Sequence, residues 1–277
     1  MRILFIGDIV GRPGRDLVRT GLGALVELHQ VDIVIANAEN AAAGSGITRE
    51  LGDQLLGYGI DVMTSGNHIW AKREALDYIG VEPRLLRPAN FPDGAPGRGS
   101  YVARTEDGRT VGVINVMGRV FMTAIDDPFA VVLREIEAMR QRTRVIFVDM
   151  HAEATSEKIA MGWHLDGKVA AVIGTHTHVQ TADDRILPRG TAFLTDVGMT
   201  GPHDSVIGVE IEPALARFLS AMPSKFEVAT GNPRLNAVVV EADERSGLAT
   251  SIERLSYSLQ ELEHLALDMP SATGRGR

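Results

Sequence analysis

The chain opens with Met1-Arg2-Ile3-Leu4-Phe5-Ile6-Gly7-Asp8, in which a short apolar run ends at a glycine and a carboxylate. Continuous apolar runs of this length with β-branched residues are typical of strands buried on both faces. Similar runs recur along the chain, at residues 3–6, 32–36, 61–64, 111–116, 144–148, 169–173, 192–195 and 237–241. The sequence therefore predicts a sheet-rich core.

Helical patterns lie between several of these runs. Residues 15–28 and 127–140 each place their apolar side chains on one stripe of a helix. Strands that alternate with helices predict an α/β fold. Residues 101–104 and 110–116 flank the turn-like segment 106–108, which indicates a hairpin, so antiparallel strands are expected beside parallel ones.

The length and composition are those of an ordinary globular protein. The 277 residues are 44% hydrophobic and 23% charged, and no internal repeat or long linker divides them. We therefore expect a single domain over residues 1–267. Residues 268–277 have the composition of a loose, disordered polar tail.

The charge pattern argues against a surface that binds duplex nucleic acid. The formal net charge is −8, and no run of Lys or Arg forms a basic patch. A nucleotide remains an acceptable substrate, because bound divalent cations can make one cleft positive on an acidic protein.

The chain contains no cysteine, which excludes disulfides, thiolate metal sites and a cysteine nucleophile. Any metal ion must therefore be bound through nitrogen and oxygen. The apolar run at residues 3–6 is too short for a signal peptide or a membrane span. The expected location is the cytoplasm, with no membrane partner.

Polar residues gather where the predicted strands end. In open α/β sheets, ligands bind beyond the carboxyl ends of the strands, where loops bring together groups that are distant in sequence. The residues in this position are Asp8, Glu39, Asn40, Asn67, His68, His151, His176 and His178.

Each of these motifs also has a structural interpretation. Asp8 could cap the helix that follows Pro13, the segment around Glu39 could be a solvated loop, and His68 could be a hydrogen-bonded residue of a tight turn. The segment 176–178 is more specific, since two imidazoles that bracket one residue can project to the same side of an extended chain. The joint occurrence of the motifs favours a metal site.

Three imidazoles, two carboxylates and an amide suit two divalent ions that share a carboxylate. Mixed nitrogen and oxygen ligands are typical of Mn, Fe, Zn or Co, whereas Mg and Ca prefer oxygen alone. Two such ions can clamp the attacking and leaving oxygens of a displacement at phosphorus. The hypothesis is a two-metal phosphoesterase.

The ordered motifs GD at 7–8, NAEN at 37–40, GNH at 66–68, His151 and GTHTH at 174–178 resemble the calcineurin-like metallophosphoesterase superfamily. Within it, MRILFIGDIVGRPGR, NAENAAAGSGIT, TSGNHIW, DMHAEATSEK and GTHTHVQT look like the bacterial YmdB-like family. The resemblance extends over roughly residues 1–240. It implies a four-layer α/β/β/α sandwich of two mixed sheets flanked by helices.

The resemblance also implies how the metal ligands divide. Asp8 and His178 would bind one ion, and Glu39 would bridge to the other. Asn40 would be a further residue of the metal site, as a ligand or as the partner of one. The second ion would be bound by Asn67, His151 and His176. Fe or Mn is the preferred metal, with Zn or Co as alternatives.

His68 is the catalytic residue that the resemblance implies, as a general acid facing the substrate. Two departures from the superfamily concern this region of the site. Val10 stands where many members have an additional histidine ligand, and Ile69 follows His68 where an orienting aspartate is usual. An orienting role can therefore not be carried over to the position after His68.

The implied reaction is hydrolysis of a phosphodiester small molecule by a hydroxide that bridges the metals, with cyclic nucleotides, including 2′,3′-cyclic species, as leading substrates. Two alternatives share the ligand set: a phosphomonoesterase, such as a nucleotidase or protein phosphatase, and a regulatory protein that binds nucleotides and hydrolyses them slowly. Trp70, Phe121 and Met122 could line a base, although packing is their more ordinary role. A homo-oligomer is expected only because such assemblies are common.

Overall fold

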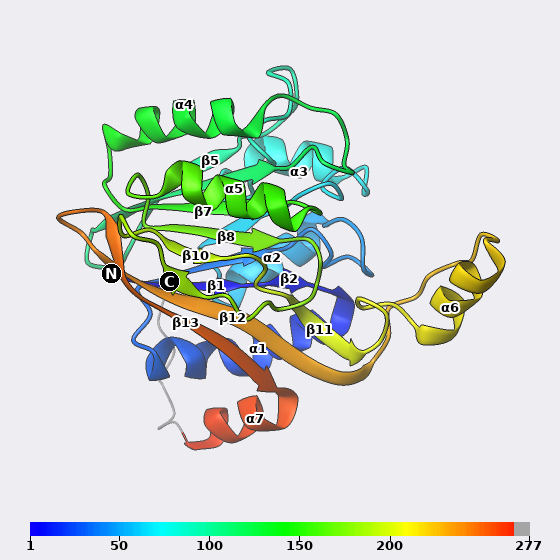
Figure 1. Cartoon of the computed structure of the whole chain (residues 1–277). Helices are drawn as coiled ribbons and strands as arrows, with labels where there is room; N and C mark the ends of the chain where they lie inside the picture. Colours follow the sequence, from blue (N-terminus) through cyan, green and yellow to red (C-terminus); the bar gives the residue numbers. More distant parts are fainter. Residues whose placement is uncertain (269–277) are drawn as a thin grey trace.

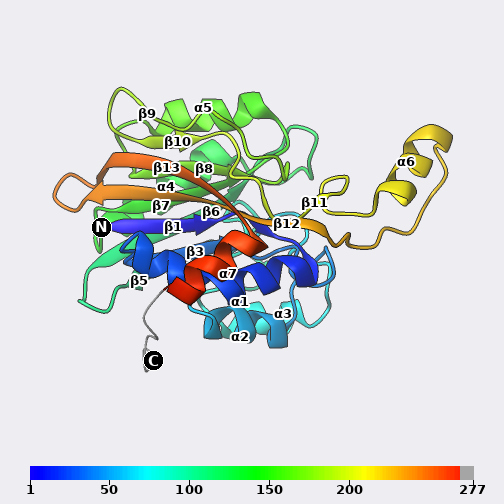
Figure 2. The same cartoon turned by 90° about the horizontal axis from the view of Figure 1, so that it is seen from below.

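The computed structural model describes residues 1–268 and arranges them in four layers (Figure 1). Two mixed sheets face each other, and helices cover the outer face of each. Helices α4 (Pro128–Arg140) and α5 (Thr155–Leu165) cover one sheet, while α1 (Gly11–Leu28), α2 (Arg49–Gly57) and α7 (Leu259–Asp268) cover the other (Figure 2). The expected α/β/β/α sandwich is confirmed.

The first sheet has the order β2-β11-β12-β1-β3-β4, with β13 paired to β12. β1 pairs with β3 and β3 with β4 in parallel, whereas β12 runs antiparallel to β1. Its strands are β1 (Arg2–Ile6), β2 (Asp8–Ile9), β3 (Ile33–Asn37), β4 (Val62–Thr64), β11 (Met199–Asp204), β12 (Gly231–Asp243) and β13 (Leu248–Ser258).

The second sheet has the order β5-β6-β7-β8-β10-β9. β6, β7, β8 and β10 are parallel neighbours, and β5 pairs with β6 as the predicted antiparallel hairpin. Its strands are β5 (Ser100–Arg104), β6 (Thr110–Met117), β7 (Ile146–His151), β8 (Ala171–Thr175), β9 (Arg185–Ile186) and β10 (Ala192–Leu194).

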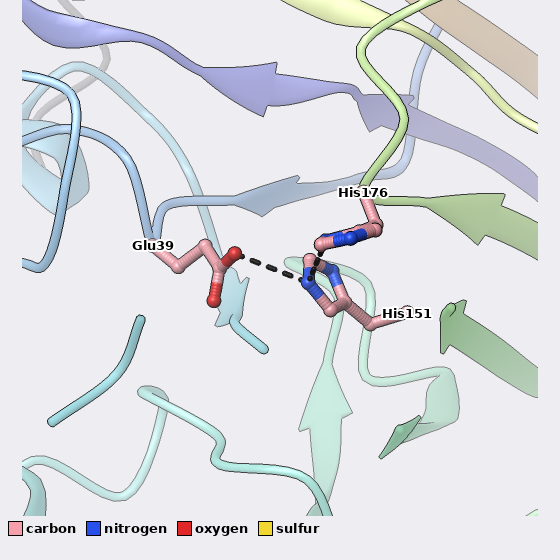
Figure 3. Close-up of side chains that lie close together, drawn as sticks. All are labelled: Glu39, His151 and His176. Atoms are coloured by element: carbon pink, nitrogen blue, oxygen red, sulfur yellow. Dashed lines mark hydrogen bonds and ion pairs between the residues drawn. The ribbon is translucent and has the colours of Figure 1, made fainter. Parts of the chain in front are cut away.

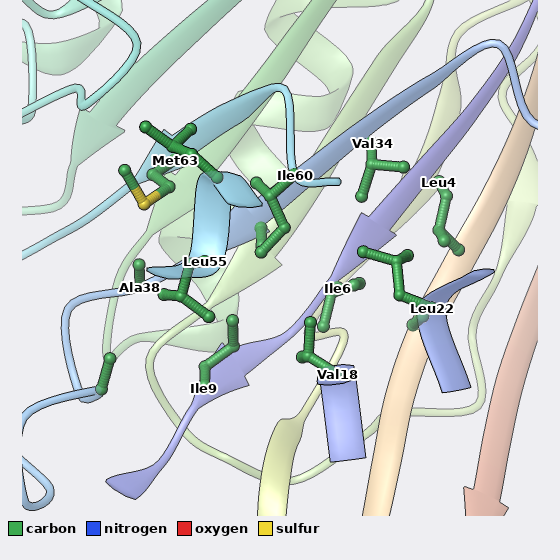
Figure 4. Close-up of a cluster of buried hydrophobic side chains, with 14 of the residues drawn as sticks. Leu4, Ile6, Ile9, Val18, Leu22, Val34, Ala38, Leu55, Ile60 and Met63 are labelled. Carbon is green, nitrogen blue, oxygen red and sulfur yellow. The ribbon is translucent and has the colours of Figure 1, made fainter. Parts of the chain in front are cut away.

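Alternate side chains along each strand point to opposite faces of the sheet and so contribute to different layers of the core. In β1, Leu4 and Ile6 pack beneath the helices (Figure 4), while Ile3 and Phe5 belong to the core between the sheets. A period of two places alternate side chains on opposite faces of a sheet, which is why a continuous apolar strand can serve two cores. Phe5 meets Phe147 of the opposite sheet with ring centroids 4.9 Å apart. A third core fills the space between the second sheet and α4 and α5.

Helix boundaries differ from the sequence prediction at α1. The helix begins at Gly11 rather than at residue 15, and its N-cap Val10 provides no side-chain hydrogen bond. Asp8 is thus not a helix cap, and its carboxylate is left for another role. At α4, Asp127 does cap the helix by accepting from the backbone N–H of Phe129. The predicted polar tail, apart from Asp268 at the end of α7, lies outside the described residues.

Two shorter helices complete the chain. Helix α3 (Ala75–Val81) follows the β4 loop and buries Tyr78 and Ile79. Helix α6 (Ile211–Ser220) stands away from the body in both views, and Ala214 is its buried residue (Figures 1 and 2). Within residues 1–268, no helix combines the length and apolar character that a bilayer-spanning segment requires.

The core between the sheets yields a stability prediction. Phe147→Ala should reduce the free energy of unfolding by about 3–5 kcal/mol, because it removes a fully buried ring and leaves a cavity between the two sheets. Phe218→Ala is the matched control, since this ring is 80% exposed and its loss should change stability by less than about 0.5 kcal/mol. Urea denaturation measures both, and equal effects would contradict the assignment of this core.

Candidate metal centre and active site

The predicted site residues come from strands that end at one edge of the sandwich. Asp8 lies in β2 directly beyond β1, Glu39 follows β3, His151 is the last residue of β7, and His176 follows β8. Parallel strands bring their carboxyl ends to the same edge, and the two sheets share this edge. Figure 3 shows Glu39, His151 and His176 converging from these three segments.

Three potential ligand atoms surround Nε2 of His151, which is itself a fourth. Oε1 of Glu39 lies 3.1 Å from it, Oδ1 of Asn67 lies 2.9 Å from it, and Nδ1 of His176 lies 3.1 Å from it. The ligand atoms of Glu39, His151 and His176 all lie within 4.8 Å of one another. Two imidazoles, a carboxylate and an amide oxygen at such separations form a compact donor set for one transition-metal ion.

A second group adjoins the first. Nε2 of His178 lies 3.8 Å from Oδ1 of Asp8, and Nδ1 of His178 is occupied by the Ile207 carbonyl at 2.7 Å. That contact orients the other nitrogen toward Asp8. The two groups are joined because the backbone N–H of His176 donates to Oδ2 of Asp8 at 3.3 Å.

Two buried oxygens test whether these residues fit metal ions. Oδ1 of Asp8 and Oδ1 of Asn40 have no hydrogen-bond partner among residues 1–268, although both side chains are buried. A buried acceptor without a partner is costly, and native proteins rarely leave one unexplained. Asn40 Nδ2 donates to the Gly44 carbonyl at 2.9 Å, which leaves its oxygen free to bind a cation. The donor atoms therefore fit the metals that the resemblance implies.

The charges in the site are balanced through His151. Burial lowers the pKa of His151, but the nearby carboxylates, Glu39 first among them, raise it to about 9. Burial and the nearby His151 charge lower the pKa of His176 to about 3. Burial also raises the pKa of Asp8. The carboxylates thus favour positive charge at His151, and a cation bound by His151 and Glu39 would supply that charge.

A buried relay holds the His151 ring in place. Nδ1 of His151 lies 2.9 Å from Oγ1 of Thr175, which in turn donates to Oδ1 of Asp149 at 2.7 Å. Thr64 donates to the other Asp149 oxygen. Burial raises the pKa of Asp149 to about 7. Outer partners of this kind fix the orientation of a metal-binding histidine. Asp149 lies two residues before His151 in β7, so that both side chains are on the same face of the strand. This spacing was the sequence signal that could have indicated that Asp149 supports His151.

The His176-Thr177-His178 segment depends on an anchor that the sequence analysis missed. Both histidines have left-handed backbone, with φ of 99° and 65°, which is strained for residues other than glycine. Oδ2 of Asp196 accepts from the Thr177 backbone N–H at 3.1 Å and from its hydroxyl at 2.7 Å. The same oxygen pairs with the Lys158 ammonium at 2.6 Å, and both charged groups are buried.

The general-acid candidate His68 is held by a residue outside the predicted set. Oγ of Ser45 lies 3.2 Å from Nδ1 of His68, so Nε2 is the ring nitrogen that this contact does not occupy. The His68 backbone N–H donates to Oε2 of Glu39 at 2.8 Å. Ile69 is buried in the core, so it has no orienting role. Ser45 is thus the side chain that contacts the His68 ring, where the resemblance would lead one to expect an aspartate after His68.

The predicted residues thus gather at one edge of the sandwich. Six of them are in side-chain contact with one another, and two are not. Direct side-chain contacts join Glu39, Asn67, His151 and His176 in one group and Asp8 and His178 in the other. Within residues 1–268, the Asn40 and His68 side chains form no hydrogen bond to these six residues. Their roles therefore rest on position beside Glu39 and Asn67.

Comparisons with known proteins show which proteins the chain is similar to. The sequence profile described as "YmdB-like protein" matches residues 4–255. A Bacillus subtilis protein named 2′,3′-cyclic-nucleotide 2′-phosphodiesterase is 49% identical over 255 residues, which cover 92% of this chain and 96% of that protein.

Two crystal structures share the fold. A protein from Thermus thermophilus has a TM-score of 0.86 at 41% identity, with 93% of this chain and 99% of that chain covered. A phosphatase from Mycoplasma pneumoniae has a TM-score of 0.87 at 33% identity, with 93% of each chain covered.

The anchor of the histidine segment can be tested by Asp196→Asn. We expect cobalt(II) to bind this variant about 10–100-fold more weakly, because loss of the charge frees Thr177 and the two strained histidines beside it. Asp166→Asn is the matched control, since Asp166 is also buried and accepts from a loop N–H, that of Arg189 at 3.0 Å, but it lies before β8 at the opposite end of the strand.

Titration of cobalt(II) absorption measures the affinity, and urea denaturation measures the stability of each variant. Both substitutions should destabilise the fold, whereas only Asp196→Asn should weaken cobalt binding. Equal cobalt affinities in the two variants would show that Asp196 does not position the histidines.

Proposed function

The chain belongs to the YmdB-like protein family and is a phosphoesterase, and we propose that it hydrolyses nucleoside 2′,3′-cyclic phosphates with two divalent transition-metal ions. The observation that carries this proposal is the convergence of nitrogen and oxygen donors on His151 and Asp8, with two buried oxygens left without partners. The substrate class is proposed from the activity for which the Bacillus subtilis relative is named.

The two groups of side chains suggest how the ions would be held. Asp8 and His178 would bind one ion, with Glu39 shared between both and Asn40 supplying its free oxygen. We propose Fe or Mn as the metal, with Zn or Co as alternatives, since the mixed nitrogen and oxygen donors do not exclude any of them. The second ion would be held by Asn67, His151 and His176.

The chemistry divides between the ions and the chain. When bound, the ions would supply an activated water and neutralise charge on the phosphate. Hydrolysis forms a bond from the water oxygen to phosphorus as the ester bond to the sugar oxygen breaks. His68 would give its proton to that leaving oxygen, and Ser45 would hold the ring for this transfer. Glu39 joins the two functions, because one carboxylate oxygen accepts from the His68 backbone and the other lies beside His151.

Three further expectations remain proposals. A cytoplasmic location, the absence of a duplex nucleic-acid partner and a homo-oligomeric state are each consistent with the composition or with general frequency. Cell fractionation and light scattering address the first and the last. The regulatory alternative, in which a nucleotide binds with little turnover, requires that the metal-loaded protein fail to hydrolyse diesters at an appreciable rate.

The metal content is the first test of the site. We expect close to two transition-metal ions per chain in metal-loaded protein. Glu39→Ala should lose both ions, because this carboxylate is assigned to both, whereas Asp8→Ala should mainly lose the ion shared with His178. Elemental analysis after desalting measures the stoichiometry. A reproducible single ion in the wild type, or full metal retention by Glu39→Ala, would contradict the dinuclear assignment.

Turnover tests the reaction and the role of His68. Metal-loaded protein should hydrolyse 2′,3′-cyclic AMP and bis(4-nitrophenyl) phosphate faster than the monoesters 3′-AMP and 4-nitrophenyl phosphate. A preference for the monoesters would replace the phosphodiesterase by a phosphomonoesterase.

His68→Ala should keep both ions and lose about 10²–10⁴-fold in kcat on the cyclic nucleotide, whose alkoxide leaving group needs a proton. It should lose much less on the nitrophenyl diester, whose phenolate leaves without one. Ser45→Ala should show the same selectivity with a smaller loss. Equal losses on both substrates would assign His68 to phosphate binding, and loss of metal would assign it to the metal site.

A further inference from the structure

The segment that connects β6 to α4 leaves the second sheet beside the metal site. Met117, the last residue of β6, is paired with His151 of β7, and the N–H of the next residue, Gly118, donates to the His151 carbonyl at 2.9 Å. Gly118 is closely enclosed, because a Cβ there would collide with Oε2 of Glu157. The segment therefore begins at a fixed point on the wall of the site.

Hydrogen bonds hold this segment at its start and its end. The Glu157 carboxylate, which is 8% exposed, accepts from the backbone N–H groups of Arg119 at 3.0 Å and Val120 at 3.2 Å. Nδ2 of Asn90 donates to the carbonyls of Met117 at 2.7 Å and Asp126 at 3.0 Å. The loop between these points is thus shaped by buried polar groups rather than left loose.

Phe121 belongs to this loop and is unusual in both its exposure and its backbone. Its ring side chain is 90% exposed, and its φ of 60° places a bulky residue in the left-handed region that favours glycine. No aromatic or cationic partner of the ring is found among residues 1–268. Strained backbone that the surroundings enforce is a reason to look for a function.

Trp70 and Met122, the other two side chains that could line a base, pack against the protein core instead. Trp70 packs against the core under α1 and α2 and meets Phe91 edge-on at 5.6 Å, and Met122 packs on the core beneath α4 and α5. Phe121 alone of the three presents its ring to solvent. Its Cα lies within about 11 Å of Gly118, since a residue extends a chain by at most about 3.6 Å.

We propose that Phe121 is the platform on which the base of the nucleotide substrate stacks. The inference rests on the proposed function, which places the phosphate at the metal centre, next to His151. An exposed ring on a loop that starts beside His151, and whose Cα lies within about 11 Å of Gly118, is close enough to take the base that the ribose carries away from the phosphate. Stacking on an aromatic side chain is tolerant of base identity, because every base presents a flat face. The site should therefore accept all four nucleosides, with purines bound more tightly.

The test compares substrates with and without a base. Phe121→Ala should raise KM for 2′,3′-cyclic AMP by about 5- to 150-fold with little change in kcat, because stacking contributes to binding and not to the bond-breaking step. The same variant should leave kcat and KM unchanged for methyl riboside 2′,3′-cyclic phosphate, which has the reacting groups but no base. Phe121→Trp should restore the low KM for the nucleotide.

Phe218→Ala is the matched control, since this phenylalanine is 80% exposed on α6, away from the body of the molecule. It should behave as wild type on both substrates. Unchanged KM for 2′,3′-cyclic AMP in Phe121→Ala, or equal losses on the two substrates, would overturn the platform. A change in the oligomeric state of Phe121→Ala, measured by light scattering, would assign the ring to a subunit interface and would also overturn it.

Failure of the proposed function is distinguishable from failure of the platform. If wild-type protein hydrolyses neither cyclic phosphate, calorimetric titration with 3′-AMP and with methyl riboside 3-phosphate decides the platform independently. Tighter binding of 3′-AMP that Phe121→Ala abolishes would support the platform without the activity. Equal binding of both compounds by the wild type would overturn it.

Discussion

Phe5 and Phe147 pack against each other between the two sheets, with ring centroids 4.9 Å apart. Phe5 belongs to β1, which leads to Asp8, and Phe147 belongs to β7, which ends at His151. The contact therefore sets how the ends of two strands from different sheets meet. A metal centre that drew ligands from both sheets would require this relation to be fixed, and close packing of the core between the sheets fixes it.

Buried polar groups orient the candidate site residues that lie at the ends of these strands. Asp149 holds His151 through Thr175, and Asp196 holds Thr177 between two histidines with left-handed backbone. The carboxylates are distinct in their surroundings. Asp149 is supported by hydroxyl groups and burial raises its pKa to about 7, whereas Asp196 is paired with the Lys158 ammonium. Such outer partners decide the orientation of the side chains they hold and are costly to leave unsatisfied, which would tie metal binding to folding.

The loops beside the candidate ligands are supported in the same way. Ser45 positions His68, and Glu157 shapes the loop that carries Phe121. Ser45 and Glu157 each support one loop through their own side chain. The shape of the loops at this edge therefore depends on a few specific contacts. Several buried polar side chains thus serve to position the loops beside one edge of the sandwich.

The amino-acid sequence by itself predicted the elements and their polar ends. Strand runs such as residues 3–6 depend on local periodicity, and the ordered motifs around Asp8, Glu39, Asn67, His151 and His176 were visible without a structure. The resemblance to metallophosphoesterases supplied the four-layer arrangement, which alternation alone would have left as a general α/β fold. The start of α1 was missed because no side chain caps it.

Only the tertiary structure decided which atoms meet. The hydrogen bond from His176 to Asp8 joins residues 168 positions apart, and that between Asn37 and Asp149 joins residues 112 apart. Local patterns carry no information about such pairs, because long-range contacts follow from the packing of whole sheets and from the completion of buried hydrogen bonds. For the same reason the anchoring by Asp196, the support of His68 by Ser45 and the exposure of Phe121 appear only in the folded chain.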